Sequence, residues 1–257
     1  MHERVETMEC FREKVAIVTG GASGIGRTVC EALGRYGASI IVADIDAQGA
    51  REVTGSISRN GGRAWPARLD VREDEEIRKL IDETVAGHGR LDYMFNNAGI
   101  DIGGETRDLL PEHWARVLDI NLKGLFFCAQ RVGQVMVEQG CGKIINVGSQ
   151  MGFVGGKLRA AYCSSKGGVV QLTKALAIEW APYGINVNGV APTFLRTPFT
   201  AAMFEDQEFY EEVVGNILFG RLGEVEDVLG AIVFLASSAS DLITGHTILV
   251  DGGWTIH

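Results

Sequence analysis

Residues 14–26 read KVAIVTGGASGIG and carry the strongest structural signal in the chain. The first part, Lys14–Thr19, is an apolar run rich in β-branched residues, which is typical of a strand buried on both faces. A cluster of glycines follows, and a pattern of helical period then runs from Arg27 to Tyr36. This order favours a strand–turn–helix unit whose backbone can approach a pyrophosphate, with the free N–H groups of the helix facing the phosphates.

Strands and helices alternate along the rest of the chain. Further short apolar runs lie at Ser39–Ala43, Leu91–Phe95, Lys143–Val147, Ile185–Val190 and Thr247–Val250. Between them lie stripes of helical period, one formed by Ile77, Leu80, Ile81 and Val85 and another by Leu118, Leu122, Leu125, Ala129, Val132 and Met136. The alternation predicts an α/β fold, with a Rossmann-type doubly wound parallel sheet in a single domain.

One segment indicates the strand order. Arg63–Leu69 has the pattern of a strand but contains Pro66, which cannot donate to a central ladder. In the order 3-2-1-4-5-6 the third strand lies at an edge, where a proline is tolerated. Because the first convincing element begins near Lys14, we expect residues 1–12 to be a loosely ordered extension and residues 13–257 to form the domain.

The composition excludes several classes of protein. With 46% hydrophobic and 22% charged residues, a chain of 257 residues can bury enough surface to offset the entropy of ordering it. A formal net charge of −9 argues against nucleic acid as a partner. No apolar run approaches the roughly 18 residues that span a bilayer, and the charged N-terminus lacks the apolar core of a signal peptide. We expect a soluble, cytoplasmic protein.

Cysteine, histidine and glycine each give a further indication. The cysteines, at positions 10, 30, 128, 141 and 163, include no CxxC pair, which favours reduced thiols. The histidines show no metal-ligand spacing, so no metal site is predicted. Glycine is abundant: it makes up 34 of the 257 residues, roughly twice the average usage of about 7%. Tight backbone positions are therefore needed, and Gly152, Gly155 and Gly156 have no assigned role.

Asp44 ends the second predicted strand, 18 residues beyond Gly26. This is close to the offset of about 20 residues at which an acid hydrogen-bonds the adenosine ribose of a dinucleotide. A carboxylate there repels a 2′-phosphate, so NAD is favoured over NADP. The alternative is that Asp44 caps the following helix, although Asp46 could serve that purpose as well.

Tyr162 and Lys166 are spaced i,i+4 in a helical stretch, so both side chains project from one face. A tyrosine is a poor base at neutral pH unless a nearby ammonium stabilises its phenolate. Ser149 follows a buried strand, where an α/β sheet places its active-site loops. Asn121 is a polar residue inside an apolar stripe, and the alternative is a solvent-facing or capping side chain.

These motifs, in this order and spacing, resemble the short-chain dehydrogenase/reductase family. The resemblance runs from about Lys14 to the C-terminus and rests on TGGASGIG, Asp44, the NNAG stretch at positions 96–99, Asn121, Ser149 and YCSSK at positions 162–166. It implies a catalytic tetrad. Tyr162 would be the general acid/base, Lys166 would lower the pKa of Tyr162 and hold the nicotinamide ribose, Ser149 would orient the carbonyl or hydroxyl, and Asn121 would hold a water in a proton relay.

The resemblance also implies NAD as cofactor and a set of contacts to it. Asp70 with Val71 matches an adenine contact, although Asp70 could equally cap the next helix. A glycine expected after Pro192 is replaced by Thr193, which puts the geometry of that loop in doubt. The implied cofactor-binding residues are Gly20, Ser23, Gly24, Ile25, Gly26, Asp44, Asp70, Val71, Asn97, Ala98, Gly99, Tyr162, Lys166, Pro192, Leu195 and Thr197.

Residues 193–219 contain much of the aromatic content of the chain, which indicates a substrate lid. The alternative is that these aromatics pack as one more pair of surface helices. The C-terminal half looks similar to family members that act on sugars, sugar acids or polyols, and more loosely to 3-oxoacyl thioester reductases. Arg159 and Arg196 could each meet a substrate anion.

We therefore expect an NAD-dependent enzyme that interconverts a secondary alcohol and a ketone. A 3-oxoacyl thioester or other carbonyl reductase is the alternative within this class, and dehydration or epimerisation with retained NAD is another. A non-catalytic NAD-binding regulator is the alternative of a different class, since fold does not fix function. The apolar helices around Trp114–Met136 and Val169–Trp180, together with the resemblance, imply a homo-oligomer, with a tetramer favoured.

Overall fold

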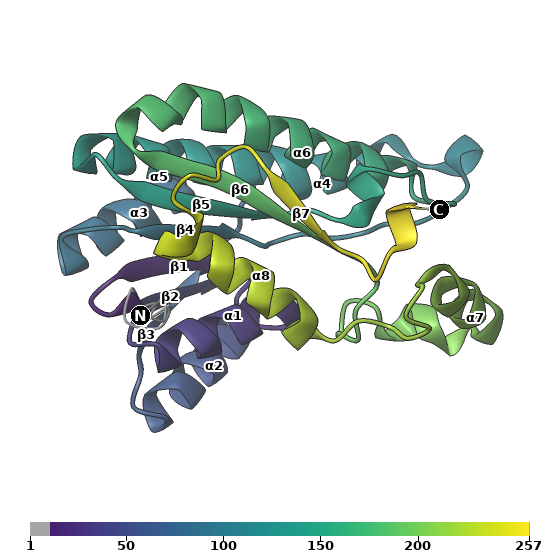
Figure 1. Cartoon of the computed structure of the whole chain (residues 1–257), viewed down its shortest axis with the longest axis horizontal. Helices are drawn as coiled ribbons and strands as arrows, with labels where there is room; N and C mark the ends of the chain where they lie inside the picture. The colour runs from purple at the N-terminus through teal and green to yellow at the C-terminus, as the bar shows by residue number, and fades with distance from the viewer. Residues whose placement is uncertain (1–10, 257) are drawn as a thin grey trace, which may run out of the picture.

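A computed structural model of the chain describes residues 11–256 and shows a parallel sheet covered by helices on both faces (Figure 1). Within these residues the sheet has seven strands in the order β3-β2-β1-β4-β5-β6-β7, and every pairing is parallel. The strands are β1 Val15–Thr19, β2 Ser39–Asp44, β3 Arg63–Arg68, β4 Tyr93–Asn96, β5 Gly142–Val147, β6 Ile185–Pro192 and β7 Thr247–Val250. The predicted fold class and strand order are confirmed.

Two groups of helices bury the two faces of the sheet. On one face α1 (Gly24–Arg35), α2 (Ala47–Arg59) and α8 (Val225–Ala236) pack over side chains such as Val18 and Ile40. On the other face α3 (Asp74–His88), α5 (Leu125–Gln139) and α6 (Ala160–Trp180) pack over side chains such as Ile17 and Ile144. Neighbouring residues of one strand thus enter opposite cores, which explains the continuous apolar runs in the sequence.

The third strand lies at the edge of the sheet, as its proline predicts. β3 pairs only with β2, and Pro66 lies opposite Val42. Trp65 is half-exposed on this strand and packs edge-on against His88, with ring centroids 4.5 Å apart. At a central position Pro66 would remove a ladder hydrogen bond, whereas at the edge its missing N–H faces away from any partner strand.

The packed core extends further toward the N-terminus than the sequence predicts. Phe11, within the predicted extension, is fully buried and packs against Tyr36 and Tyr93 at ring-centroid distances of 5.9 and 5.6 Å. The aromatic ring therefore belongs to the domain. The remainder of the predicted extension, residues 1–10, lies outside the described residues.

The predicted helix from Leu118 to Met136 is interrupted. α4 (Pro111–Leu118) passes into a π-helical turn, Asp119–Gly124, before α5 begins at Leu125. Such a turn holds one more residue per hydrogen-bonded loop than an α-helix and re-aims the side chains on it. The apolar stripe is consequently split: Leu125 and Met136 enter the core, whereas Leu122 lines an outer groove.

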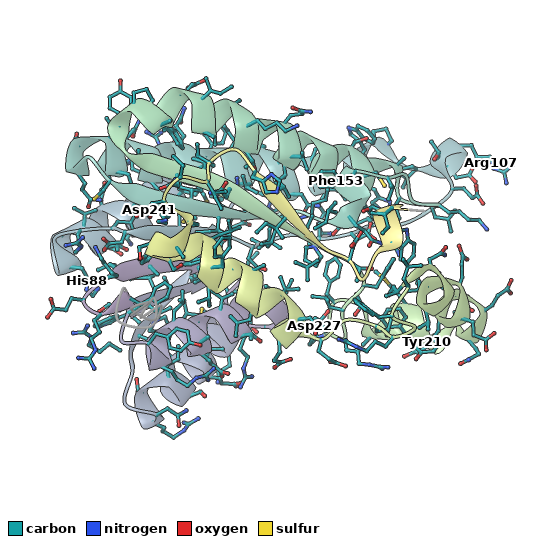
Figure 2. All side chains as sticks on the ribbon, viewed as in Figure 1. His88, Arg107, Phe153, Tyr210, Asp227 and Asp241 are labelled. Carbon is teal, nitrogen blue, oxygen red and sulfur yellow. The ribbon has the colours of Figure 1, made fainter. Side chains whose placement is uncertain are left out.

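Residues 193–219, between β6 and α8, form a separate segment beside the sheet. It contains a 3₁₀ helix, Ala201–Glu205, and α7 (Gln207–Asn216). α7 projects beyond the start of α8, as the positions of Tyr210 and Asp227 in Figure 2 show. Among the described residues, none of the helices is long and apolar enough to cross a membrane.

Candidate active site

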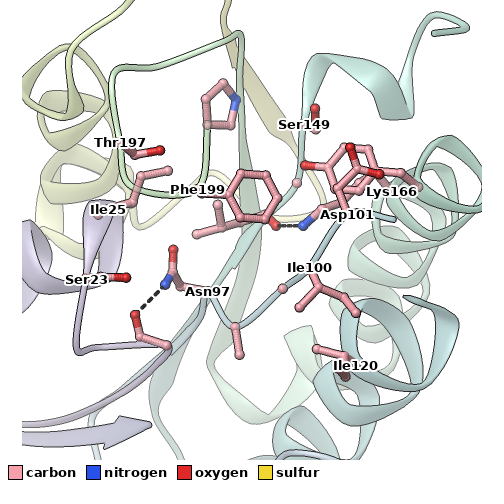
Figure 3. Close-up of a pocket in the computed structure, with 18 of the residues that line it drawn as sticks. Ser23, Ile25, Asn97, Ile100, Asp101, Ile120, Ser149, Lys166, Thr197 and Phe199 are labelled. Carbon is pink, nitrogen blue, oxygen red and sulfur yellow. Dashed lines mark hydrogen bonds between the residues drawn. The ribbon is translucent and has the colours of Figure 1, made fainter. Parts of the chain in front are cut away.

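A cavity of about 400 Å³ opens at the carboxyl ends of β1, β4, β5 and β6 (Figure 3). This is where a doubly wound sheet places its ligands, because the loops leaving the strands diverge there. Its walls include all of the predicted cofactor-binding and catalytic residues except Gly26 and Asn121. Gly26 and Asn121 lie behind the cavity wall, where each contacts a residue that lines it.

The glycine-rich turn brings backbone close to the cavity. Gly20 and Gly24 have φ angles of +63° and +51°, which side-chain-bearing residues rarely adopt. A Cβ on Gly26 would lie 2.1 Å from the carbonyl oxygen of Gly20, so Gly26 allows the turn to fold back on the helix. Gly26 is therefore a packing position beneath the turn.

The N-terminus of α1 is built to receive an anion. Its N-cap residue, Ser23, makes no side-chain capping bond, and its first turn carries no acidic residue. Ser23, Gly24 and Ile25 line the cavity, so the free N–H groups and partial positive charge of the helix face it. A pyrophosphate fits this arrangement.

Asn97 joins the turn to the loop after β4. Its Nδ2 donates to the carbonyl oxygens of Thr19 and Gly20 at 3.1 and 3.0 Å, and Figure 3 shows Asn97 in the wall of the cavity. In return Thr19 Oγ1 accepts from the backbone N–H groups of Asn97 and Ala98. These bonds hold two loops from adjacent strands as one wall of the cavity.

The carboxylate of Asp44 points back toward the glycine-rich turn. One oxygen accepts from the N–H of Ala22 at 3.0 Å and the other from the N–H of Asp46 at 2.9 Å. The capping role belongs to Asp46, whose carboxylate accepts from Gln48 and Gly49 at the start of α2. Asp44 is thus free of the capping role, and it lies in the wall of the cavity.

Asp70 does not cap the following helix, because the N-cap residue of α3 is Glu73. Asp70 instead accepts from both the backbone and the guanidinium of Arg72. The side-chain hydrogen bond from Arg72 is the largest of the effects that lower the pKa of Asp70. Asp70 and Val71 both line the cavity, at the end that Asp44 also borders.

Tyr162 and Lys166 lie on one face of α6, as predicted. The ammonium of Lys166 is 5.7 Å from the centre of the Tyr162 ring and donates to the carbonyl of Val147 at 2.8 Å. Burial lowers the pKa of Lys166 to about 8. Lys166 is therefore held between the tyrosine and the end of β5.

The pKa of Tyr162 differs from expectation in both direction and cause. Burial raises it, while a hydrogen bond with Ser149 and the positive charge of Arg159 lower it. The sequence predicts that Lys166 lowers this pKa, but in this structure the Lys166 ammonium is directed to the Val147 carbonyl. The stabilisation of a phenolate here comes from Ser149 and Arg159.

Asn121 lies in the π-helical turn and is fully buried, which corrects the solvent-facing alternative. Its carboxamide bonds the N–H and the C=O of Ile100, each at 2.8 Å, and donates to Ser165 Oγ at 3.1 Å. A Cβ on Gly99 would lie 3.3 Å from Asn121 Oδ1 and 3.7 Å from Lys166 Nζ. Asn121 and Lys166 therefore flank the same glycine.

Arg159, a predicted anion contact, lines the cavity together with Asp101, which the sequence pattern does not identify. Arg159 forms an ion pair with Asp101, and both line the cavity close to Tyr162. Arg159 stands out as a cation three residues before Tyr162, whereas nothing in the sequence joins it to Asp101, 58 residues earlier. Arg196, the other predicted anion contact, is half-exposed, pairs with Glu224 and does not line the cavity.

The aromatic residues of 193–219 largely pack on one another. Phe194 contacts Phe204 and Phe209 edge-on, with ring centroids 6.2 and 5.7 Å apart. These rings belong to a small separate core over Val213 and Ile217. Phe194 also lines the cavity, as do Phe199 and Met203, so this segment forms one of its walls.

Among the residues that the structure describes, no cluster of His, Cys, Asp or Glu could hold a metal ion. The four cysteines within this range, at positions 30, 128, 141 and 163, are free thiols.

Gly152, unexplained in the sequence, packs the turn after Ser149 onto α6. A Cβ added at Gly152 would lie 2.7 Å from the carbonyl oxygen of Lys166.

Comparison with known proteins gives consistent matches over almost the whole chain. A family model described as enoyl-(acyl carrier protein) reductase matches residues 20–255. The chain is 37% identical over 244 residues to an NAD-dependent glycerol dehydrogenase from Listeria innocua, covering 95% of this chain and 94% of that protein.

Solved structures share the fold closely. A short-chain type dehydrogenase/reductase from Mycobacterium marinum superposes with a TM-score of 0.92 at 35% identity, covering 98% of this chain and all of that one. A gluconate 5-dehydrogenase from Burkholderia cenocepacia, solved with NADP and tartrate, gives a TM-score of 0.93 at 36% identity with the same coverage.

Proposed function

The chain belongs to the short-chain dehydrogenase/reductase family, and on that premise we propose that it interconverts a secondary alcohol and a ketone of the sugar, sugar acid or polyol class with NAD. It is an oxidoreductase acting on CH–OH groups. The observation that carries the proposal is the meeting of Tyr162, Ser149 and Lys166 in one cavity with the N-terminus of α1. Relatives named for glycerol and gluconate support the substrate class.

The chain supplies the proton chemistry and the positioning. When bound, the nicotinamide exchanges a hydride with the substrate carbon. Tyr162 takes the hydroxyl proton during oxidation and returns it during reduction, and Ser149 hydrogen-bonds the same substrate oxygen. Lys166 holds the nicotinamide ribose. Asn121 and Lys166 both lie beside Gly99, and Asn121 would hold the water of a proton relay there.

The residues around the cavity fit a dinucleotide. The α1 N-terminus faces it without a competing acid, and Asp44 lies at the side of the turn where a ribose would follow the pyrophosphate. The family uses NAD or NADP, and one relative was solved with NADP. We favour NAD because the carboxylate of Asp44 would repel a 2′-phosphate, and Arg72, a cation of the same wall, is engaged by Asp70.

The test is a panel of secondary alcohols assayed for reduction of NAD and of NADP. We expect turnover with at least one sugar, sugar acid or polyol, and a kcat/KM for NAD at least roughly tenfold above that for NADP. An absence of turnover with every alcohol would contradict the proposed function. A preference for NADP would contradict the cofactor assignment alone.

We also propose that the protein is a homo-oligomer, with a tetramer favoured. An apolar groove over α5, α6 and the π-helical turn is lined by Leu122, Phe126, Phe127 and Leu172. Apolar surface of this kind on a globular protein is typical of an interface. Light scattering should give a mass that is a multiple of 27.7 kDa, and a monomer at assay concentration would contradict the proposal.

For localisation we propose the cytoplasm. Free thiols at Cys30, Cys128, Cys141 and Cys163 suit a reducing compartment. Fractionation of the source cells tests this, and recovery outside the soluble cytoplasmic fraction would contradict it.

A further inference from the structure

The cavity wall collects buried polar atoms that have no hydrogen-bond partner in the chain. Within residues 11–256 such side-chain atoms occur on four residues: Asn96, Asp101, Gln150 and Thr193. All of these except Asn96 line the cavity. Because buried polar groups in proteins are nearly always paired, the three exceptions point to a ligand that pairs with them.

Asp101 is the most informative of the three. Its side chain is 2% exposed, and one carboxylate oxygen, Oδ2, pairs with Arg159 Nη1. The other oxygen, Oδ1, has no partner within the chain. An ionised carboxylate accepts hydrogen bonds and donates none, so Oδ1 calls for a donor such as a hydroxyl group.

The charge of Arg159 is already balanced. Its side chain is 13% exposed and contacts Asp101, the rings of Phe194 and Phe209 at 5.6 and 5.9 Å, and the sulfur of Met203 at 3.3 Å. Arg159 is therefore enclosed by partners and leaves no unpaired cation for a substrate carboxylate. Of the other cations that line the cavity, Lys166 is directed to the Val147 carbonyl and Arg72 to Asp70, and Arg116 is exposed on α4.

Gln150 extends the same polar surface. It directly follows Ser149, its side chain is 1% exposed, and neither its Oε1 nor its Nε2 has a partner within the chain. A primary amide both donates and accepts hydrogen bonds, so it can pair with a hydroxyl group that accepts or donates. Thr193 Oγ1, at the end of β6, adds a third such group.

We propose that the substrate is an uncharged polyhydroxylated alcohol, whose hydroxyl groups beside the reacting carbon donate to Asp101 Oδ1 and pair with Gln150. This inference rests on the proposed alcohol oxidation and narrows it. A sugar acid would bring a carboxylate toward Asp101, which like charges oppose. A thioester or a simple cyclic alcohol lacks the donors that Asp101 requires, and would leave its buried Oδ1 without a hydrogen bond.

The test compares matched substrates with the purified enzyme and NAD. Pentitols and hexitols are assayed beside the aldonates of the same carbon number and beside cyclopentanol. We expect the best polyol to exceed the best aldonate and cyclopentanol at least tenfold in kcat/KM. A wild-type preference for an aldonate or for cyclopentanol would overturn the inference while leaving the alcohol oxidation intact. No turnover with any alcohol would overturn the proposed function and this inference with it.

Asp101→Asn sharpens the comparison, because it keeps the shape of the side chain and frees the charge of Arg159. The ratio of polyol to aldonate kcat/KM should fall at least tenfold. Asp108→Asn, at an exposed carboxylate later in the same connection, should leave the ratio unchanged. An unchanged ratio in a folded Asp101→Asn enzyme would refute the assignment.

A measurement on the wild type alone covers the case in which Asp101→Asn does not fold. Polyols added to the enzyme with NADH should raise its unfolding temperature more than equal concentrations of aldonates. Greater stabilisation by the aldonates would overturn the inference.

Discussion

The ammonium of Lys166 donates to the carbonyl of Val147, the last residue of β5, across 2.8 Å. This bond holds helix α6 against the strand that leads into Ser149. It therefore fixes two predicted catalytic residues, Lys166 and Ser149, relative to each other. The ammonium is taken out of water in the process, and burial lowers the pKa of Lys166 to about 8.

The lowered pKa makes stability depend on pH. An unfolded lysine titrates near 10.5, so between pH 8 and 10.5 the unfolded chain binds more protons than the folded one, and stability rises with pH. Lys166→Met removes this contribution. The free energy of unfolding of the wild type relative to the variant should increase across this range, by up to about 3 kcal/mol. Urea titrations at a series of pH values measure this difference, with Lys174→Met, at an exposed lysine, as the control. A difference in the free energy of unfolding that does not change with pH would contradict the prediction.

Tyr162→Phe should remove the proton donor and acceptor while keeping the ring that packs beside Lys166. We expect kcat to fall by about 10²–10⁴-fold, with the dissociation constant for NADH changed less than about threefold. Steady-state kinetics and NADH fluorescence titration measure the two quantities. Undiminished turnover would rule out Tyr162 as the acid/base.

Asp44→Asn tests the selection of the cofactor. With the charge removed, the ratio of kcat/KM for NADP to that for NAD should rise roughly tenfold or more, since the 2′-phosphate is no longer repelled. Asp46→Asn is the matched control, because Asp46 caps α2 and its loss should affect stability without changing the ratio. Equal ratios in the two variants would argue against the ribose contact.

Asn121→Ala should destabilise the protein, because it leaves the N–H and the C=O of Ile100 without their side-chain partner. We expect a loss of about 2 kcal/mol in the free energy of unfolding, accompanied by a lower kcat. Asn60→Ala, at the exposed C-terminus of α2, should lose much less. A change in urea unfolding no larger than that of the control would show that Asn121 is not structural.

Gly152→Ala should lower kcat, since its Cβ would meet the backbone of Lys166 at 2.7 Å and push the turn after Ser149 away from α6. Gly155→Ala lies in the same loop, where a Cβ would meet nothing within 4 Å. The two alanine variants differ only in that contact. We expect at least a tenfold difference in kcat between them, and equal rates would contradict the contact.

Local patterns predict much of this fold and part of its site. The strands of the core carry their own signal because both faces of each are buried, and Pro66 marks the edge strand through a property of proline alone. Tyr162 and Lys166 were predictable together because four residues along a helix bring side chains onto one face.

What the sequence hides are relationships between distant residues. Asp101 and Arg159 meet only after β4 and α6 are assembled, and Asp70 turns to Arg72 rather than to the helix it precedes. The pKa of Tyr162 likewise depends on how deeply the fold buries the phenol and on where Lys166 points. None of these contacts can be predicted from the spacing of residues along the chain.

The π-helical turn at Asp119–Gly124 makes this stretch sensitive to its length as well as to its side chains. Deleting one residue from it would let α4 and α5 run on as a single α-helix with their faces nearly in register, and would remove the widened turn on which Asn121 and Leu122 lie. Asn121 would then leave Ile100, and Leu122 would leave the outer groove. Among homologous chains, insertions and deletions should be rare here, and so should substitutions of Asn121.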